Sequence, residues 1–329
     1  MSAVAPTLQS FFTDRLARQR QASPRTVASY RDTFRLLVCF VQTTTGKSPS
    51  ALDWDDLDEA VITAFLEHLE VERHNTTRTR NLRLTAIRSL FAYAALRHPE
   101  HAAVVQRVLA IPTKRFDKAT VNFLTTEEAS ALIAAPDRQH WVGRRDRALL
   151  VVALQTGLRV SELIGLNCGD VVLGTGGHVR CEGKGRKQRG VPITSSAQDV
   201  LRTWMAERAG RPSDPLFPTT TGRRLSRDAI ERRVATHAAT AAKHCRSLQA
   251  KKLHPHVLRH SCAMALLQAR VDVAVIALWL GHSDIRSTDP YVHADMTIKE
   301  RALALAAPPS VRPGRYKPPD TVLAFLDNL

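Results

Sequence analysis

The sequence predicts a mainly α-helical protein of two domains, with a small β-sheet or hairpin in the second domain. The chain has 329 residues, enough for two domains, and 44% of them are hydrophobic, enough to bury a sizeable core. Apolar residues recur at helical spacing over most of its length. One stretch differs: "HVRCEGKGRKQRGVPIT" has strand-like ends around a glycine-rich basic middle, which is typical of a β-hairpin.

Residues 1–112 are expected to form helices. One helix opens at Ser23-Pro24, since proline suits a first helical turn, and apolar residues then repeat on one face: Val27, Tyr30, Phe34, Leu37 and Val41. Two more helices are predicted over residues 55–70 and 76–96. The last of these carries four arginines, which form either a solvated basic face or a face that lies against phosphates: Arg78, Arg80, Arg83 and Arg88.

A short polar and basic connector separates the two domains. Thr125 or Thr126 then begins a new helix, because Glu127 and Glu128 suit its positive N-terminal end. After residue 307 the chain is rich in proline and is expected to dock on its own surface or on a neighbouring subunit. The predicted boundaries are a helical domain over 1–112, a linker over 113–123, a second domain over 124–307 and a tail over 308–329.

The charge of the chain indicates an anionic partner. Lysine and arginine total 47 against 31 acidic residues, and the formal net charge is +16. Nucleic acid is the usual partner of such a basic protein. The charge is spread along the chain instead of lying on one amphipathic helix, and neither an export signal nor a long apolar run is found, so no membrane association is predicted. Five cysteines without a CxxC pair favour reduced thiols and a cytoplasmic location.

Two stretches place basic residues where an anion could bind. In "LLVVALQTGLRVSELIGL", an apolar helix ends near Gly157, and Arg159 starts the next helix with Glu162 one turn later. Arg159 there forms either a structural salt bridge with Glu162 or part of a site. The hairpin is the second stretch: Gly183 and Gly185 flank Lys184, so the backbone can approach a ligand closely, although a solvated basic turn explains it equally.

A third stretch, "LHPHVLRHSCAMALL", predicts a phosphate site at the start of a helix. Pro255 suits the first turn, and His256, Arg259 and His260 share one face. Free backbone amides, the helix dipole, a histidine and an arginine would then converge on one anion. A zinc site is the alternative, but the HxxxH pair lacks the glutamate of HExxH, and an adjacent arginine would repel a dication. No metal or other cofactor is therefore predicted.

The fourth stretch, "LGHSDIRSTDPYVH", contains one of only four tyrosines in the chain. Asp272 can cap a helix that runs to Leu280 and ends at Gly281, His282 follows directly, and Tyr291 lies nine residues further on. A lone tyrosine usually serves packing, so this stretch alone predicts little.

Taken together, the four stretches resemble the signature of the tyrosine recombinase (phage integrase) family. The matching motifs are "TGLRVSEL", "GKGRKQR", "HPHVLRHSCA" and "LGHSDIRST", and the resemblance covers nearly the whole chain. It implies a helical SAM-like core-binding domain and a catalytic domain that together form a C-shaped clamp on DNA. The compact form is expected, of the Xer or transposon type. Its catalytic residues would be Arg159, Lys184, His256, Arg259, His282 and Tyr291.

The resemblance also implies a role for each residue. Tyr291 would attack a DNA phosphate and hold a 3′-phosphotyrosine link, so that rejoining needs neither ATP nor a divalent metal. Arg159 and Arg259 would neutralise the phosphate, Lys184 would protonate the leaving 5′ oxygen and His256 would accept the proton of the tyrosine. His282 would donate to the phosphate, and Glu162 would orient Arg159 or His256. Further DNA contacts are expected from Arg78, Arg80, Arg83, Arg88, Arg186, Lys187, Arg189 and Arg227.

Double-stranded DNA and a tetramer on it are the expected partners, since strand exchange joins two duplexes through four active sites. The tetramer would contain only this chain or also a related recombinase. Two other functions fit the same residues: an inactive or regulatory DNA-binding relative, and a type IB topoisomerase-like enzyme. Two positions depart from the family pattern. Arg270 stands where a glycine usually ends a helix, and Pro290 directly precedes Tyr291.

Overall fold

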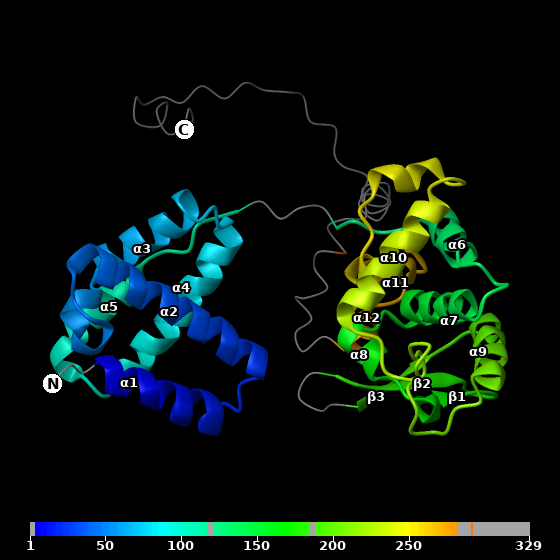
Figure 1. The fold of residues 1–329 in the computed structure, drawn as a ribbon, viewed down its shortest axis with the longest axis horizontal. Helices are drawn as coiled ribbons and strands as arrows, with labels where there is room; N and C mark the ends of the chain where they lie inside the picture. Colours follow the sequence, from blue (N-terminus) through cyan, green and yellow to red (C-terminus); the bar gives the residue numbers. More distant parts are fainter. Residues whose placement is uncertain (1–3, 117–120, 184–187, 282–290, 292–329) are drawn as a thin grey trace, which may run out of the picture. The chain divides into compact units, whose positions relative to one another are not determined.

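The computed structural model describes residues 4–116, 121–183, 188–281 and 291. The chain divides into two compact units, residues 1–118 and 119–329 (Figure 1). Helices dominate both, and the second contains one small sheet, so the predicted fold class is confirmed. The C-shaped clamp concerns the placement of the two units and stays a prediction.

The first unit is a helical bundle, and its three predicted helices are confirmed. Its helices are α1 Val4–Ser10, the π-helical continuation Phe11–Gln19, α2 Pro24–Thr45, α3 Glu59–Val71, α4 Thr77–Ala94 and α5 Ala102–Ala110, with short 3-10 turns at Pro49–Ala51, Trp54–Leu57 and Pro99–His101. The hydroxyl of Ser23 caps α2 through the amide of Thr26, and Thr76 caps α4 in the same way. The second predicted helix begins later than expected, because Asp53 caps a separate 3-10 turn before α3.

Aromatic side chains fill the core of the first unit. Phe11, Trp54, Phe65 and Phe91 are fully buried. The ring of Trp54 meets that of Phe91 edge-on at 5.3 Å between centroids, a favourable arrangement for aromatic pairs. The unit therefore has a core of its own.

The second unit combines helices with a three-stranded antiparallel sheet in the order β1-β2-β3. The strands are β1 Val171–Val172, β2 His178–Glu182 and β3 Gln188–Pro192. The helices are α6 Thr126–Ala134, α7 Trp141–Thr156, α8 Val160–Gly165, α9 Ser195–Arg208, α10 Arg227–Ala241, α11 Pro255–Gln268 and α12 Val273–Leu280, with 3-10 turns at Cys168–Asp170 and Arg246–Ala250. The predicted hairpin corresponds to β2 and β3, in which Cys181 pairs with Arg189. No described helix of either unit has both the length and the apolar character needed to cross a membrane.

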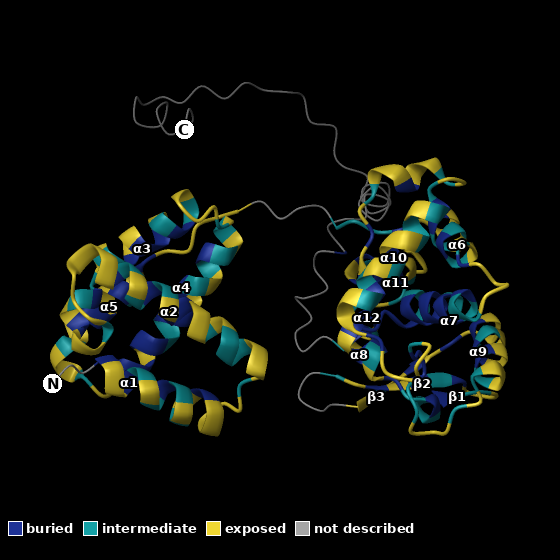
Figure 2. Cartoon of the chain, in the orientation of Figure 1, coloured by how far each residue is buried: buried dark blue, intermediate teal, exposed yellow. Residues whose placement is uncertain are grey.

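Helix α7 forms the centre of the second unit. It packs against α6, α9 and α11, and its residues from Ala148 to Ala153 are buried (Figure 2). It also carries a fully buried ion pair. The guanidinium of Arg145 donates to Asp146 Oδ1 from Nε at 2.9 Å and from Nη2 at 2.6 Å, and to the carbonyl of Pro218 at 2.7 Å. Arg233 and His237 of α10 bind the second oxygen of Asp146, so the carboxylate links α7 to α10.

Three turns with left-handed backbone shape the region around the C-terminal ends of α7, α11 and α12. Gly157 ends α7 at φ 60°, and a Cβ there would lie 2.6 Å from Leu280 Cδ2. Gly281 ends α12 at φ 65°, as predicted from the sequence. Arg270 follows α11 at φ 63°, so the turn is kept without glycine, at a cost of about 1–2 kcal/mol. Pro290 lies outside the described residues.

Candidate active site

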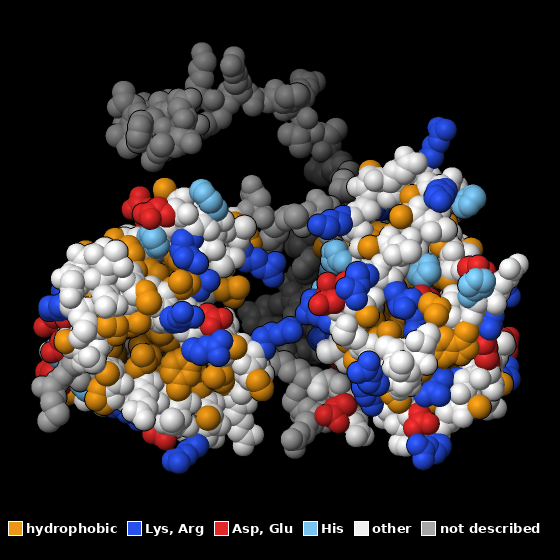
Figure 3. Space-filling view, in the orientation of Figure 1, with side chains coloured by type: hydrophobic (Ala, Val, Ile, Leu, Met, Phe, Trp, Pro, Cys, Tyr) orange, Lys and Arg blue, Asp and Glu red, His pale blue; other side chains and the backbone are white. Residues whose placement is uncertain are grey.

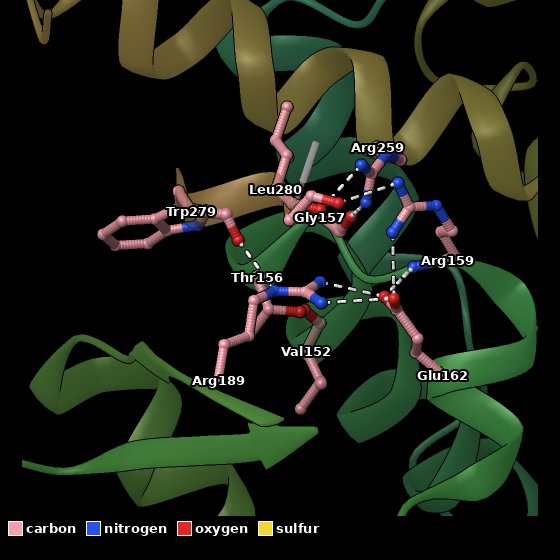
Figure 4. Close-up of polar contacts among 10 residues, drawn as sticks. Val152, Thr156, Gly157, Arg159, Glu162, Arg189, Arg259, Trp279 and Leu280 are labelled. Atoms are coloured by element: carbon pink, nitrogen blue, oxygen red, sulfur yellow. Dashed lines mark hydrogen bonds and ion pairs between the residues drawn. The ribbon is translucent and has the colours of Figure 1, made fainter. Parts of the chain in front are cut away.

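Three arginines and one glutamate from α8, β3 and α11 converge on the C-terminal ends of α7 and α12 (Figure 4). The side chains are those of Arg159, Glu162, Arg189 and Arg259. Sequence distance between them reaches about a hundred residues, and only the fold brings them together.

Arg159 is held at the N-terminus of α8 in a defined orientation. Its amide donates to Glu162 Oε2 at 2.8 Å, and its Nη1 donates to Oε1 at 3.0 Å. Its Nη2 donates to the carbonyl of Gly281 at 3.1 Å. The side chain is still 33% exposed, so the structural salt bridge and an open guanidinium face coexist.

Glu162 is the central acid of the site. Its side chain is 3% exposed. Arg189 forms a bidentate ion pair with it, in which Nη1 donates to Oε1 at 3.2 Å and Nη2 donates to Oε2 at 2.9 Å. Burial alone would raise the pKa of Glu162, but the bonds from Arg189 and from the Arg159 amide outweigh it and hold the pKa below its usual value. The carboxylate therefore stays ionised between the two arginines.

Arg189 of β3 makes its hydrogen bonds within the second unit. Besides Glu162, its Nε donates to the carbonyl of Trp279 at 3.1 Å, and its side chain is 15% exposed. The guanidinium is engaged inside the protein, and the predicted direct DNA contact stays a prediction. Arg189 positions Glu162 and the end of α12.

Arg259 is buried, at 4% exposure, on α11. Its Nη1 donates to the carbonyl of Gly157 at 2.6 Å and its Nη2 to that of Leu280 at 2.8 Å. Burial, followed by the charge of Arg159, lowers the pKa of Arg259 to about 10, so it remains a cation at neutral pH. Three consecutive carbonyls at the C-terminal end of α12 thus accept from three arginines: Trp279 from Arg189, Leu280 from Arg259 and Gly281, the residue that follows the helix, from Arg159.

Tyr291 lies against this cluster, at 4% exposure. Its hydroxyl lies 2.9 Å from Nδ1 of His260, and the two rings are 5.4 Å apart. Burial raises the pKa of Tyr291, although the charges of Arg259 and Arg159 and a hydrogen bond with Arg259 act in the opposite direction. The phenol oxygen is therefore in the same site as both predicted phosphate ligands.

The histidine at the hydroxyl is not the predicted one. The family resemblance assigned the proton acceptor to His256, whereas the α11 histidine bonded to the hydroxyl is His260. His256 lies one turn earlier on α11, and its imidazole reaches the surface. Partial burial and the charges of His254 and Arg227 lower the pKa of His256. The i, i+4 spacing of the two histidines placed His260 on the right face, but nothing in the sequence singled it out.

Several predicted site residues fall outside the described parts of the chain. They are Lys184, Arg186, Lys187 and His282. Their roles stay predictions.

The predicted DNA-contacting arginines of the first unit have different environments. Arg78 is exposed and Arg83 is half-buried. Arg80 is 5% exposed and donates to the carbonyl of Pro112 at 3.2 Å, and Arg88 donates to the carbonyl of Ile111. The buried guanidinium of Arg80 links the segment at Pro112 to α4, and its predicted DNA contact stays a prediction.

Positive charge is spread over both units. Lysine and arginine side chains occur across the visible faces, with fewer acidic ones between them (Figure 3). Arg227, also expected to contact DNA, is exposed at the start of α10 and pairs with Glu231 at 2.8 Å. Within residues 4–116, 121–183, 188–281 and 291, no three histidine, cysteine or acidic side chains come together as a metal site would require.

Two family descriptions match the chain. The phage integrase family matches residues 122–297, and the N-terminal SAM-like domain of phage integrases matches residues 10–98. The first match alone spans more than half of the chain.

Relatives of known name match over most of their length. The integrase/recombinase y4rC of Sinorhizobium fredii is 50% identical over 328 residues, which cover 100% of this chain and 99% of y4rC. Tyrosine recombinase XerC of Pelobacter propionicus is 32% identical over 284 residues, which cover 85% of this chain and 88% of XerC.

Solved structures share the fold. XerH recombinase in a post-cleavage complex with palindromic difH substrate matches with a TM-score of 0.70 at 23% identity, covering 88% of this chain and 82% of its own. The Tn1549 transposon integrase in complex with transposon right end DNA matches with a TM-score of 0.69 at 16% identity, covering 92% of this chain and 99% of its own.

Proposed function

The chain belongs to the phage integrase family of tyrosine recombinases, enzymes that cut and rejoin DNA, and from this premise we propose that Tyr291 is its nucleophile. The hydroxyl of Tyr291 attacks a DNA phosphate and forms a 3′-phosphotyrosine link. The observation that supports this best is the placement of the phenol beside Arg259, which also binds the ends of α7 and α12.

The arginines supply the electrostatic part of the reaction. The phosphate gains negative charge as the phosphorus becomes five-coordinate, and guanidiniums fixed in advance stabilise that charge without reorganising. Arg159 has an exposed face for a non-bridging oxygen, while Glu162 and Arg189 fix its direction. Each charge-assisted hydrogen bond to the phosphate contributes about 1.5–3 kcal/mol.

The assignment can be tested with nicked DNA half-sites, in which the cleaved fragment diffuses away and the adduct accumulates. The half-sites are taken from a library of DNA sequences that flank the gene, and the reaction contains no added Mg²⁺. The wild-type chain should form a covalent adduct, and Tyr291→Phe should form none while it binds DNA normally. Tyr30→Phe is the matched control, because Tyr30 lies in the first unit. Equal adduct from the Tyr291 variant would overturn the assignment.

Arg159→Ala should lower the adduct yield by about 10²–10³ with little change in DNA affinity, because many other cations hold the backbone. Undiminished adduct from this variant would exclude Arg159 from the reaction.

We further propose that the active form is a tetramer on DNA, with two duplexes and four tyrosines. The tail over 308–329 is proposed to link the subunits. Removing it should reduce the assembly on DNA without loss of single-site binding, which sedimentation of the protein–DNA complex measures. An unchanged assembly would rule out the tail as the link.

A further inference from the structure

His260, which the family signature did not assign, lies in contact with the phenol oxygen of Tyr291. Its Nδ1 lies 2.9 Å from the hydroxyl of Tyr291. We propose that His260 is the proton acceptor of the reaction: as the phenol oxygen attacks phosphorus, Nδ1 of His260 takes the hydroxyl proton. This inference rests on the proposed role of Tyr291 as nucleophile.

The contact between the two side chains sets the direction of the proton in the proposed step. A phenol keeps its proton at neutral pH, and a neutral imidazole has one nitrogen that accepts. Nδ1 is the nitrogen of His260 that lies within hydrogen-bond distance of the hydroxyl. In the reactive tautomer the hydroxyl donates to Nδ1, and His260 carries its own proton on Nε2.

The surroundings of His260 keep its acceptor nitrogen free. The charged or titratable groups that act on it are His254, His256 and Arg259, all of them basic. Burial, followed by the charges of these groups, lowers the pKa of His260 to about 4, so the imidazole is neutral at neutral pH. Burial raises the pKa of Tyr291 at the same time, so the phenol keeps its proton in the free protein.

A bound phosphodiester changes this balance. It brings a negative charge beside Arg159 and Arg259, and the charge grows in the transition state. The positive charge of nearby basic groups disfavours the protonated form of His260. When the phosphate partly neutralises that charge, protonation of His260 becomes more favourable. The nucleophile is thus activated when DNA occupies the site and stays inert otherwise.

The step balances without an external reactant. The Oη–H bond of Tyr291 breaks as the Oη–P bond forms, and the proton passes to Nδ1 of His260. The P–O5′ bond breaks, and the 5′ oxygen takes a proton from the group that the family resemblance assigns, Lys184. In rejoining, the 5′ hydroxyl attacks the phosphotyrosine and returns its proton to Lys184, the P–Oη bond breaks, and His260 returns its proton to the phenol oxygen.

A substrate with sulfur in place of the bridging 5′ oxygen separates the two proton transfers. A thiolate leaves without help, because a thiol is a far stronger acid than an alcohol. His260→Asn keeps a polar group near the position of Nδ1 but cannot take a proton, and His260→Phe removes the polar group. His244→Ala is the matched control, because His244 is an exposed histidine of the same unit that lies after α10.

Both His260 variants should lower single-turnover cleavage by about 10²–10⁴-fold on the natural and the sulfur substrate alike, with unchanged DNA binding and melting temperature. The control should cleave at the wild-type rate. Near wild-type cleavage by His260→Asn would overturn the inference, and so would rescue of either variant by sulfur, which would assign His260 to the leaving group. Adduct from Tyr291→Phe in the same assay would instead overturn the proposed function.

Discussion

Replacing Glu162 by glutamine tests whether this carboxylate holds the arginines of the site. The side chain is almost wholly buried and accepts four hydrogen bonds, two from Arg159 and two from Arg189. Glutamine has nearly the same shape. It retains one acceptor oxygen, and its amide group would face a guanidinium that can only donate.

The four bonds set the size of the effect. Removing one partner of a buried ion pair costs about 3–5 kcal/mol. Arg159 is one-third exposed, so water weakens the contribution of its ion pair with Glu162 to stability. Arg189 is largely buried, so its ion pair with Glu162 contributes almost in full. We therefore expect Glu162→Gln to lower the free energy of unfolding by about 3 kcal/mol, the lower end of that range. In a unit of this size the loss corresponds to a drop of about 6–12 °C in melting temperature.

Tryptophan fluorescence during urea unfolding at pH 7 measures this loss. Three of the four tryptophans belong to the second unit, Trp141, Trp204 and Trp279, so the signal reports mainly on the unit that contains the site. Glu207→Gln is the control, because Glu207 forms an ion pair with Arg144 at the surface.

Acid should reduce the difference between wild type and Glu162→Gln. The folded-state pKa of Glu162 lies below its unfolded value, so the stabilisation is complete above the unfolded pKa of about 4.3 and is lost as the pH falls through the folded pKa. A loss at pH 7 no larger than that of the Glu207 control would refute the central role of Glu162.

Two further substitutions probe the frame of the site. Gly157→Ala should destabilise the second unit by more than the cost of an alanine in the left-handed conformation, which is about 1–2 kcal/mol, because its Cβ would also lie 2.6 Å from Leu280. Gly46→Ala is the control: Gly46 has a similar φ and open space around it, so urea unfolding of this variant measures the conformational cost alone. Equal losses of stability in the two variants would contradict the clash with Leu280. Asp146→Asn should cost about 3–5 kcal/mol at pH 7 by leaving the charge of Arg145 buried. Burial alone would raise the pKa of Asp146, but its hydrogen-bonded and cationic partners lower it. The variant should therefore also lose less stability than wild type as the pH falls below the unfolded pKa of about 3.9. Parallel acid limbs in a stability–pH series would contradict this.

Much of the fold could be predicted because its signals are local. The cap at Ser23, the glycine that ends α7, the proline that starts α11 and the hairpin each depend on a few adjacent residues, and all are found in the structure. Strand β1 was missed, because two residues are too few for an alternating pattern.

The contacts inside the site could be predicted only in part. The spacing of Arg159 and Glu162 indicated their salt bridge, and the shared face of α11 placed Arg259 and His260 together. The second ion pair of Glu162 is formed with Arg189, which lies on β3. A pattern within a single helix or strand cannot predict an ion pair between two elements. A choice between His256 and His260 likewise needs the position of Tyr291, which depends on tertiary packing.

The three carbonyls at the end of α12 have a thermodynamic consequence. Arg159 and Arg259 use part of their donor capacity on Gly281 and Leu280, so a phosphate that approaches them competes with the peptide backbone. Coupling of this kind is reciprocal. If bound DNA weakens the hydrogen bonds from the arginines to the end of α12, then loss of those hydrogen bonds strengthens DNA binding by the same free energy. The affinity for DNA and the stability of the contacts that hold the end of α12, the last described helix before Tyr291, are therefore linked, and a change in one changes the other.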